Sequence, residues 1–168
     1  VHNRNEIVAE DQVLLNGRNI FNAGSITTTV GIVDLNATND ITNIGSITGA
    51  TQVDVNAGNE LHLKNGLVTG RTHVIMHAGN NAIFEGTSIT GALVDITSGG
   101  NVSMTAGSIN SADGTINITA NNDISHKNGS IIAENASLTA GNNIVLEDGE
   151  LSAENANLIA TNGELKQV

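Results

Sequence analysis

Apolar residues recur along the chain in short alternating runs, separated by corners rich in Asn, Gly and Ser. The clearest run is a pair of apolar residues two positions apart, and this pair returns every 20 to 22 residues. Its eight copies are Val13/Leu15, Val33/Leu35, Val53/Val55, Val74/Met76, Val94/Ile96, Ile116/Ile118, Ala136/Leu138 and Ala156/Leu158. An alternation of period two predicts short strands whose apolar side chains share one face.

Two further sets of positions follow in register with these pairs. A second inward pair is Leu61/Leu63, Ala82/Phe84, Val102/Met104, Ile124/His126 and Ile144/Leu146, and a third apolar position is Ile26, Ile47, Val68, Ile89, Ile109, Ile131 and Leu151. A strand this short is stable only when the next repeat stacks on it. The sequence therefore predicts an all-β, right-handed parallel β-helix of about eight coils, with three short strands per coil and one repeat segment over residues 1–168.

The composition fits a narrow, fully hydrogen-bonded stack. The chain has no Pro, Cys, Trp or Tyr and only two Phe. Columns of Val, Ile, Leu and Ala fill a thin interior, and a Pro would remove a ladder hydrogen bond. The net charge of −11 disfavours a nucleic-acid partner. No apolar run reaches about 18 residues, so we expect no membrane insertion.

Stacking predicts which surface side chains meet. The corner positions Asn19, Asn39, Asn59, Asn80, Asn122, Asn142 and Asn162 share one column, interrupted by Gly100, and we expect a ladder of side-chain amides there. Lys64 would meet Glu85, and Lys127 would meet Glu147. Like charges also stack, as Asp34 on Asp54, Asp40 on Glu60 and Glu134 on Glu154. Screening by solvent explains these acidic pairs, and a Ca²⁺ site is the alternative.

Candidate catalytic and metal-binding residues are few. His73 and His77 would lie about 13 Å apart along one strand, too far to share an ion. His126 falls at an inward position, where we expect a bulge to turn it outward. No Cys, no phosphate-binding loop and no carboxylate cluster with adjoining Arg or Lys is present. We therefore expect no enzyme activity, no cofactor, no metal site and no catalytic residue.

Two surface features leave alternatives open. Thr27, Thr48, Thr69 and Thr90 fall in a single file, whereas ice-binding β-helices present double files of Thr. Sequons for Asn glycosylation begin at Asn36, Asn101, Asn117, Asn128 and Asn135. The abundance of Asn and Thr accounts for them, and glycosylation is the alternative.

Three phrases carry a resemblance to a known family. They are Leu138 to Leu146 (LTAGNNIVL), Val102 to Ile109 (VSMTAGSI) and Gly149 to Leu158 (GELSAENANL). They resemble the haemagglutinin repeats of filamentous haemagglutinin-like exoproteins, which Gram-negative bacteria export by two-partner secretion. The resemblance covers nearly the whole chain, although the family's secretion domain with its Asn-Pro motifs is missing.

The resemblance implies an interior fragment of a longer secreted protein that stands at the cell surface. It implies an outer-membrane transporter as export partner, a receptor on a host or neighbouring cell, and a monomeric rod. The function it implies is the structural stalk of an adhesin. The alternative is the filament of a contact-dependent growth-inhibition protein that delivers a toxin.

Overall fold

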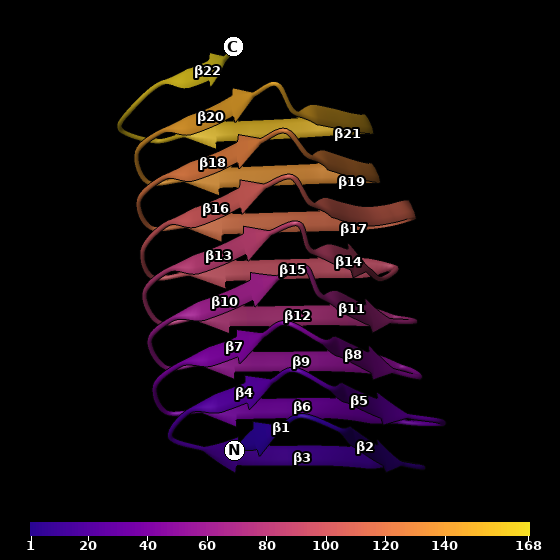
Figure 1. Cartoon of the computed structure of the whole chain (residues 1–168). Coiled ribbons are helices and arrows are strands. Elements are labelled where there is room, and N and C mark those ends of the chain that lie inside the picture. The colour runs from indigo at the N-terminus through magenta and orange to yellow at the C-terminus, as the bar shows by residue number, and fades with distance from the viewer.

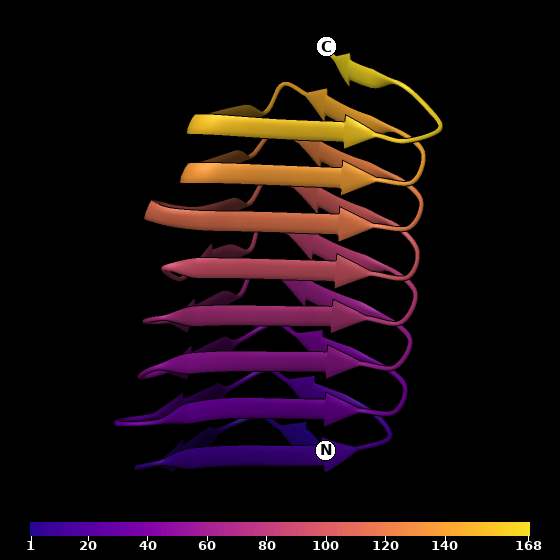
Figure 2. The same cartoon turned by 180° about the vertical axis from the view of Figure 1, so that it is seen from behind.

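The computed structural model describes all residues, 1–168, as a stack of right-handed coils without any helix (Figure 1). All strand pairs are parallel, and the coils rise from the N-terminus at one end to the C-terminus at the other (Figures 1 and 2). The predicted all-β parallel β-helix is confirmed. Three faces surround the interior, and we call them face 1, face 2 and face 3 in the order in which each coil forms them.

Face 1 is a sheet of nine strands, one from each successive turn of the chain. Its strands are β1 (His2–Asn3), β4 (Ile20–Asn22), β7 (Ile41–Asn43), β10 (Leu61–Lys64), β13 (Ala82–Glu85), β16 (Val102–Thr105), β18 (Ile124–Lys127), β20 (Ile144–Glu147) and β22 (Leu165–Gln167).

Faces 2 and 3 are separate strands in the first five coils. The strands of face 2 are β2 (Glu6–Ala9), β5 (Ser25–Thr28), β8 (Ser46–Gly49), β11 (Leu67–Gly70) and β14 (Ser88–Thr90). The strands of face 3 are β3 (Gln12–Gly17), β6 (Ile32–Ala37), β9 (Gln52–Ala57), β12 (His73–Ala78) and β15 (Leu93–Ser98).

In the last three coils one long strand forms both faces, which differs from the predicted three strands per coil. These strands are β17 (Ser108–Ala120), β19 (Ser130–Ala140) and β21 (Glu150–Ala160). The corner between the faces has shortened to the single residues Glu134 and Glu154, so ladder pairing continues through it on both sides. The extra residues of the longest repeat lie in β17 between Ser111 and Thr115, where the register shifts.

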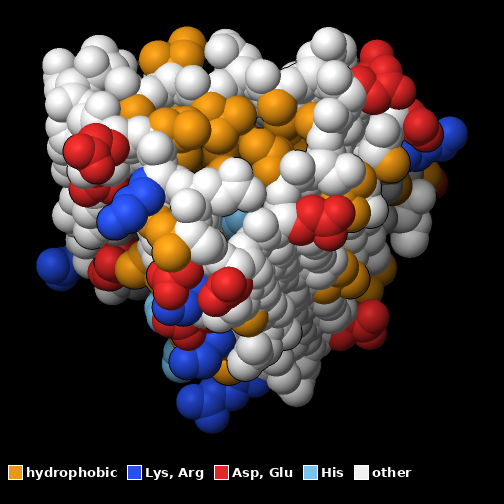
Figure 3. Space-filling model, turned by 90° about the horizontal axis from the view of Figure 1, so that it is seen from above, with side chains coloured by type: hydrophobic (Ala, Val, Ile, Leu, Met, Phe, Trp, Pro, Cys, Tyr) orange, Lys and Arg blue, Asp and Glu red, His pale blue; other side chains and the backbone are white.

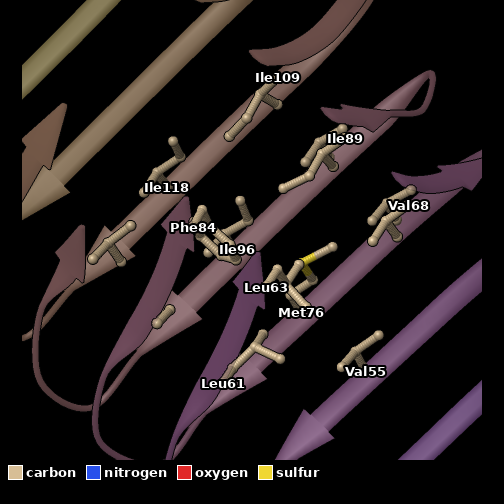
Figure 4. Close-up of a cluster of buried hydrophobic side chains, with 14 of the residues drawn as sticks. Val55, Leu61, Leu63, Val68, Met76, Phe84, Ile89, Ile96, Ile109 and Ile118 are labelled. Atoms are coloured by element: carbon tan, nitrogen blue, oxygen red, sulfur yellow. The ribbon is translucent and has the colours of Figure 1, made fainter. Parts of the chain in front are cut away.

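The predicted columns are in register from the first coil to the last. Val13 pairs with Val33, and this column continues coil by coil to Ala156. The inward side chains form one hydrophobic cluster of 36 buried residues. Figure 4 shows how Leu61, Leu63 and Phe84 of face 1 meet Met76 and Ile96 of face 3 across the interior.

The corners between faces 1 and 2 change conformation along the stack. From the fourth coil upward the corner residue has a positive φ, between 48° and 57°, at Asn65, Gly86, Ala106, Asn128 and Asp148. Asn, Asp and Gly tolerate this left-handed region, whereas Ala occupies it at a cost. Backbone hydrogen bonds also link the corners of successive coils, as from Ser108 N to Thr87 O (2.9 Å). The stack is therefore bonded around its circumference as well as along its faces.

Candidate functional site

Three buried asparagines form a ladder inside face 1 of the first coils. Asn3 Nδ2 donates to Asn22 Oδ1 (2.7 Å), and Asn22 Nδ2 donates to Asn43 Oδ1 (2.6 Å). Each amide also reaches the backbone, as Asn22 Nδ2 donates to Ser46 O (3.1 Å) and Asn43 Nδ2 to Gly45 O (3.0 Å). Asn22 and Asn43 are fully buried, so these bonds satisfy polar groups that would otherwise be costly. The role of the ladder is structural.

Sequence reasoning missed this ladder. The available signal was Ile20-Phe21-Asn22 followed by Ile41-Thr42-Asn43, at the positions where later repeats carry Leu63 or Phe84. The two Asn residues align in the register of β4 and β7. Because Asn is frequent at the corners throughout the chain, its inward copies did not stand out.

The amide ladder predicted at the corner forms only at its start. Asn39 Nδ2 donates to Asn19 Oδ1 (2.9 Å), but Asn59 Nδ2 donates instead to Asp40 Oδ1 (2.7 Å). The prediction of a continuous ladder through Asn80, Asn122, Asn142 and Asn162 is therefore wrong. Asn162, for example, donates to the backbone oxygen of Gly141 (2.9 Å).

The adjoining corner position, directly before each face 1 strand, makes the repeated contacts instead. Asn101 Oδ1 accepts a hydrogen bond from the backbone N of Asp123 (3.1 Å) in the next coil. Asp123 Oδ1 likewise accepts from Asn143 N (2.9 Å), and Asn143 Oδ1 from Glu164 N (3.0 Å). A side chain with an oxygen at this point fixes the spacing of successive corners. This is why Asn and Asp alternate there without loss of structure.

Both predicted ion pairs on face 1 are confirmed. Lys64 Nζ lies 3.0 Å from Glu85 Oε2, and Lys127 Nζ contacts Glu147. The hydrogen bond and charge of Lys64 hold the pKa of Glu85 below its usual value, and those of Glu147 raise the pKa of Lys127. All four side chains remain about half exposed, so solvent screens them. They mark the register of the stack.

The stacked acids are in the predicted columns, and neighbouring amides bind them. Asp34 pairs with Asp54 in register on face 3. Asn36 Nδ2 donates to Asp34 Oδ1 (2.7 Å), and Gln52 Nε2 donates to both carboxylate oxygens of Asp54 (2.8 and 2.7 Å). No three His, Asp or Glu side chains are grouped so that they would hold a metal ion. These amide hydrogen bonds offset part of the repulsion between Asp34 and Asp54.

His73 and His77 lie on the outward side of β12, as expected. Nδ1 of His73 is 3.0 Å from Thr72 Oγ1, and Nδ1 of His77 is 2.9 Å from Thr97 Oγ1. A third histidine, His62, places Nε2 3.7 Å from Glu85 Oε1 beside the Lys64 pair. Each histidine thus has a different local partner.

The prediction that a bulge turns His126 outward is wrong. β18 pairs without a break with β16 below and β20 above, so His126 stays in the inward column between Met104 and Leu146. Its side chain is fully buried. The only register shift of the long strands is at Ser111 to Thr115, in another corner.

Face 2 carries the predicted file of threonines together with a second file. Thr27, Thr48 and Thr69 align in register, and Thr90 continues the column. Two residues before each lies the file Ser25, Ser46, Leu67, Ser88 and Ser108. The predicted single file of Thr is therefore confirmed, and the file beside it consists of Ser residues interrupted by Leu67. The Thr column ends at Asn110, which pairs with Thr90 and is followed by Ile132.

The surface has shallow depressions and no deep cleft. The largest lies over the corner that follows face 3, lined by Asn16, Arg18, Asn36, Thr38 and Asn56 among others. A second depression is lined mainly by Asn and Ser of β17, β19 and β21. A third is lined by Asp123, Asn143, Glu164 and Lys166 among others. These depressions follow the repeating corners and strands. They do not bring the candidate residues of the sequence together.

Comparisons with family models, with curated proteins and with solved structures give no match for this chain. The chain also forms no helix that could cross a membrane.

Proposed function

We propose that this chain is a rigid spacer, the stalk of a large adhesin displayed at the surface of a Gram-negative bacterium. The observation that carries the proposal is the unbroken register of the inward columns through every coil. Each coil repeats the same contacts with its neighbours and adds about 4.8 Å of length. Length can therefore change by whole coils without a change of architecture.

Apolar side chains are open at both ends of the stack. Seen from the C-terminal end, a patch of apolar side chains is open to solvent (Figure 3). Leu151, Ala153 and Leu158 there, and Ile7 and Leu15 at the other end, are only partly buried. The edges of β3 and β21 also pair on one side only.

The surface is consistent with a spacer that holds a binding region away from the cell. Its polar groups are arranged in columns, and neighbouring amides and lysines bind several of its carboxylates, such as those of Asp34, Asp54 and Glu85. Surface display, export by a two-partner transporter and adhesion are proposals from the haemagglutinin-like repeats. The toxin-delivery filament shares the same spacer and differs in what the spacer carries.

A coil-exact deletion tests the spacer. Removing residues 53–73 joins Gln52 to Val74, which takes the place of Val53, its register partner in the coil below. Removing residues 53–63 instead joins an outward position of face 3 directly to an outward position of face 1. This junction breaks the inward–outward alternation, so the deletion is the matched control. Both deletions are made in the full-length protein of the parent bacterium, and surface exposure and attachment to target cells are measured.

We expect the coil-exact deletion to remain displayed and to support attachment, whereas the control deletion loses both. If the coil-exact variant is displayed and folded but no longer attaches, the coils themselves bind the target and the spacer proposal fails. If the unaltered protein never appears outside the cell, the surface proposal fails.

A further inference from the structure

His126 is the one ionisable side chain among the buried polar residues. The others are Asn3, Asn22, Thr28, Asn43, Thr87, Ser98 and Ser111. Its exposed fraction is zero, and neither Nδ1 nor Nε2 has a hydrogen-bond partner. A neutral imidazole carries one N–H donor and one acceptor nitrogen, so both functions are left unsatisfied.

Two glycines make room for the ring. A Cβ placed on Gly149 would lie 2.7 Å from Nδ1 of His126, and one on Gly129 would lie 2.9 Å from Nε2. Met104 lies below the ring in the column and Leu146 above it. The imidazole therefore fills a closed space between two corners and two apolar side chains. No part of it reaches solvent.

No charge near the ring compensates a proton. The neighbouring strand β16 carries no charged residue. The charged groups on and beside the other elements around it lie at outward or corner positions, namely Asp113, Asp123, Lys127, Glu134, Glu147, Asp148, Glu150 and Glu154. Lys127 and Glu147 are engaged with each other. Burial alone lowers the pKa of His126 below its usual 6.5, without any opposing contribution from a carboxylate.

We propose that acidification opens the coil stack around His126, because its ring takes up a proton only after leaving the apolar interior. The open form binds the proton at the usual pKa, whereas the closed form binds it at a lower one. The stability of the closed form relative to the open form is thus greatest above pH 6.5, and it decreases as the pH falls below 6.5. The opening equilibrium then rises about tenfold for each pH unit, until the pKa of the closed form is reached.

The first coils provide an internal reference. The inward polar groups there are amides, which do not titrate in this range and are hydrogen-bonded to one another. Acid therefore acts on one stretch of the rod, from β16 to β20, and leaves the stretch from β4 to β7 closed. The proposal thus gives the chain a pH-sensitive stretch, from β16 to β20, which we call the joint.

Hydrogen exchange of the full chain, followed by mass spectrometry at pH 7.5 and pH 5 and corrected for intrinsic rates, tests the joint. We expect the opening equilibrium constant of peptides within residues 124–151 to be more than tenfold larger at pH 5 than at pH 7.5. The opening equilibrium constant of peptides within residues 20–45 should change little. His126→Met, which repeats the neighbouring Met104, is expected to remove the difference. His77→Gln, at an exposed position, is the control and retains it.

Equal protection of residues 124–151 at both pH values in the unaltered chain would overturn the proposal. So would an acid effect that persists in His126→Met. If that variant does not fold, His126→Leu, which repeats Leu146, takes its place. Independently, an NMR titration in which the His126 ring titrates at or above 6.5 in the folded chain contradicts the proposal.

Discussion

One inward column of face 1 changes character along the rod. In the first coils it holds Asn3, Asn22 and Asn43, which bond to one another in sequence. Above them the same column holds Leu63, Phe84, Met104, His126 and Leu146. The backbone pairing is the same in both regions. The stack therefore accepts polar residues inside when consecutive coils supply partners, and His126 shows what happens when they do not.

The largest effect is expected in the apolar region. Phe84→Ala removes the largest fully buried side chain, between Leu63 and Met104. A cavity of this kind lowers the free energy of unfolding by about 3–5 kcal/mol. Denaturant unfolding measures the loss, and Phe21→Ala, at an outward position of face 1, is the control with a smaller effect. Equal losses in the two variants would contradict the inward assignment of this column.

Breaking the ladder in its middle is expected to cost slightly less. Asn22→Leu removes the donor to the buried Asn43 Oδ1 and to Ser46 O, whereas Asn3 Nδ2 keeps its bond to Ser25 O. Each group left unpaired costs about 1–3 kcal/mol, so we expect a loss of about 3 kcal/mol in denaturant unfolding. Asn43→Leu, at the end of the ladder, leaves Asn22 Nδ2 its bonds to Ser46 O and Gly24 O and should cost less. The reverse order would show that the amides are not acting as a ladder.

Substitution of His126 is expected to raise the free energy of unfolding rather than lower it. His126→Leu removes two unpaired polar atoms from the apolar region and raises the free energy of unfolding at pH 7.5 by about 1–3 kcal/mol. Because the pKa of the folded histidine is lowered, the gain should grow as the pH falls below 6.5. Unfolding curves at several pH values measure this gain. A gain that does not vary with pH would mean that the ring takes up its proton equally in the folded and unfolded states.

The smallest effect on stability is expected for a substitution in a surface ion pair. Lys64→Gln removes the cation beside Glu85, so we expect the pKa of Glu85 to return toward 4.5. NMR titration of the Glu85 side chain detects this change, and Lys166→Gln is a distant control. Stability should barely respond, because the pair is half exposed and screened. A large loss of stability would indicate that the pair does more than mark register.

The repeat period and the alternation of apolar residues were enough to predict the columns, since a register error of one residue would turn every apolar side chain outward. The ion pairs followed from the same register. The inner Asn ladder did not, because an inward Asn becomes favourable only when the same position of a neighbouring coil is also Asn. His126 was misplaced because a polar residue in an apolar column suggested a bulge. The unbroken pairing of β18 on both sides outweighs the cost of one buried ring.

The merging of faces 2 and 3 also escaped prediction. In β19 and β21 it depends on corners of one residue, such as Glu134, that let backbone pairing continue from Ala133 to Asn135. Neither Glu134 nor Glu154 belongs to the residue types that mark a turn. The Ser file beside Thr27 and Thr48 was present in the sequence as Ser25 and Ser46, but its alignment needed the register of β5 and β8.

Small-angle X-ray scattering of the chain and of its coil-exact deletion of residues 53–73 tests most directly whether the coils form an extendable rod. The prediction is that the longest dimension falls by about 5 Å while the radius of gyration of the cross-section stays the same. A changed cross-section, or loss of the folded scattering profile, would contradict the claim that each coil is an interchangeable unit of length.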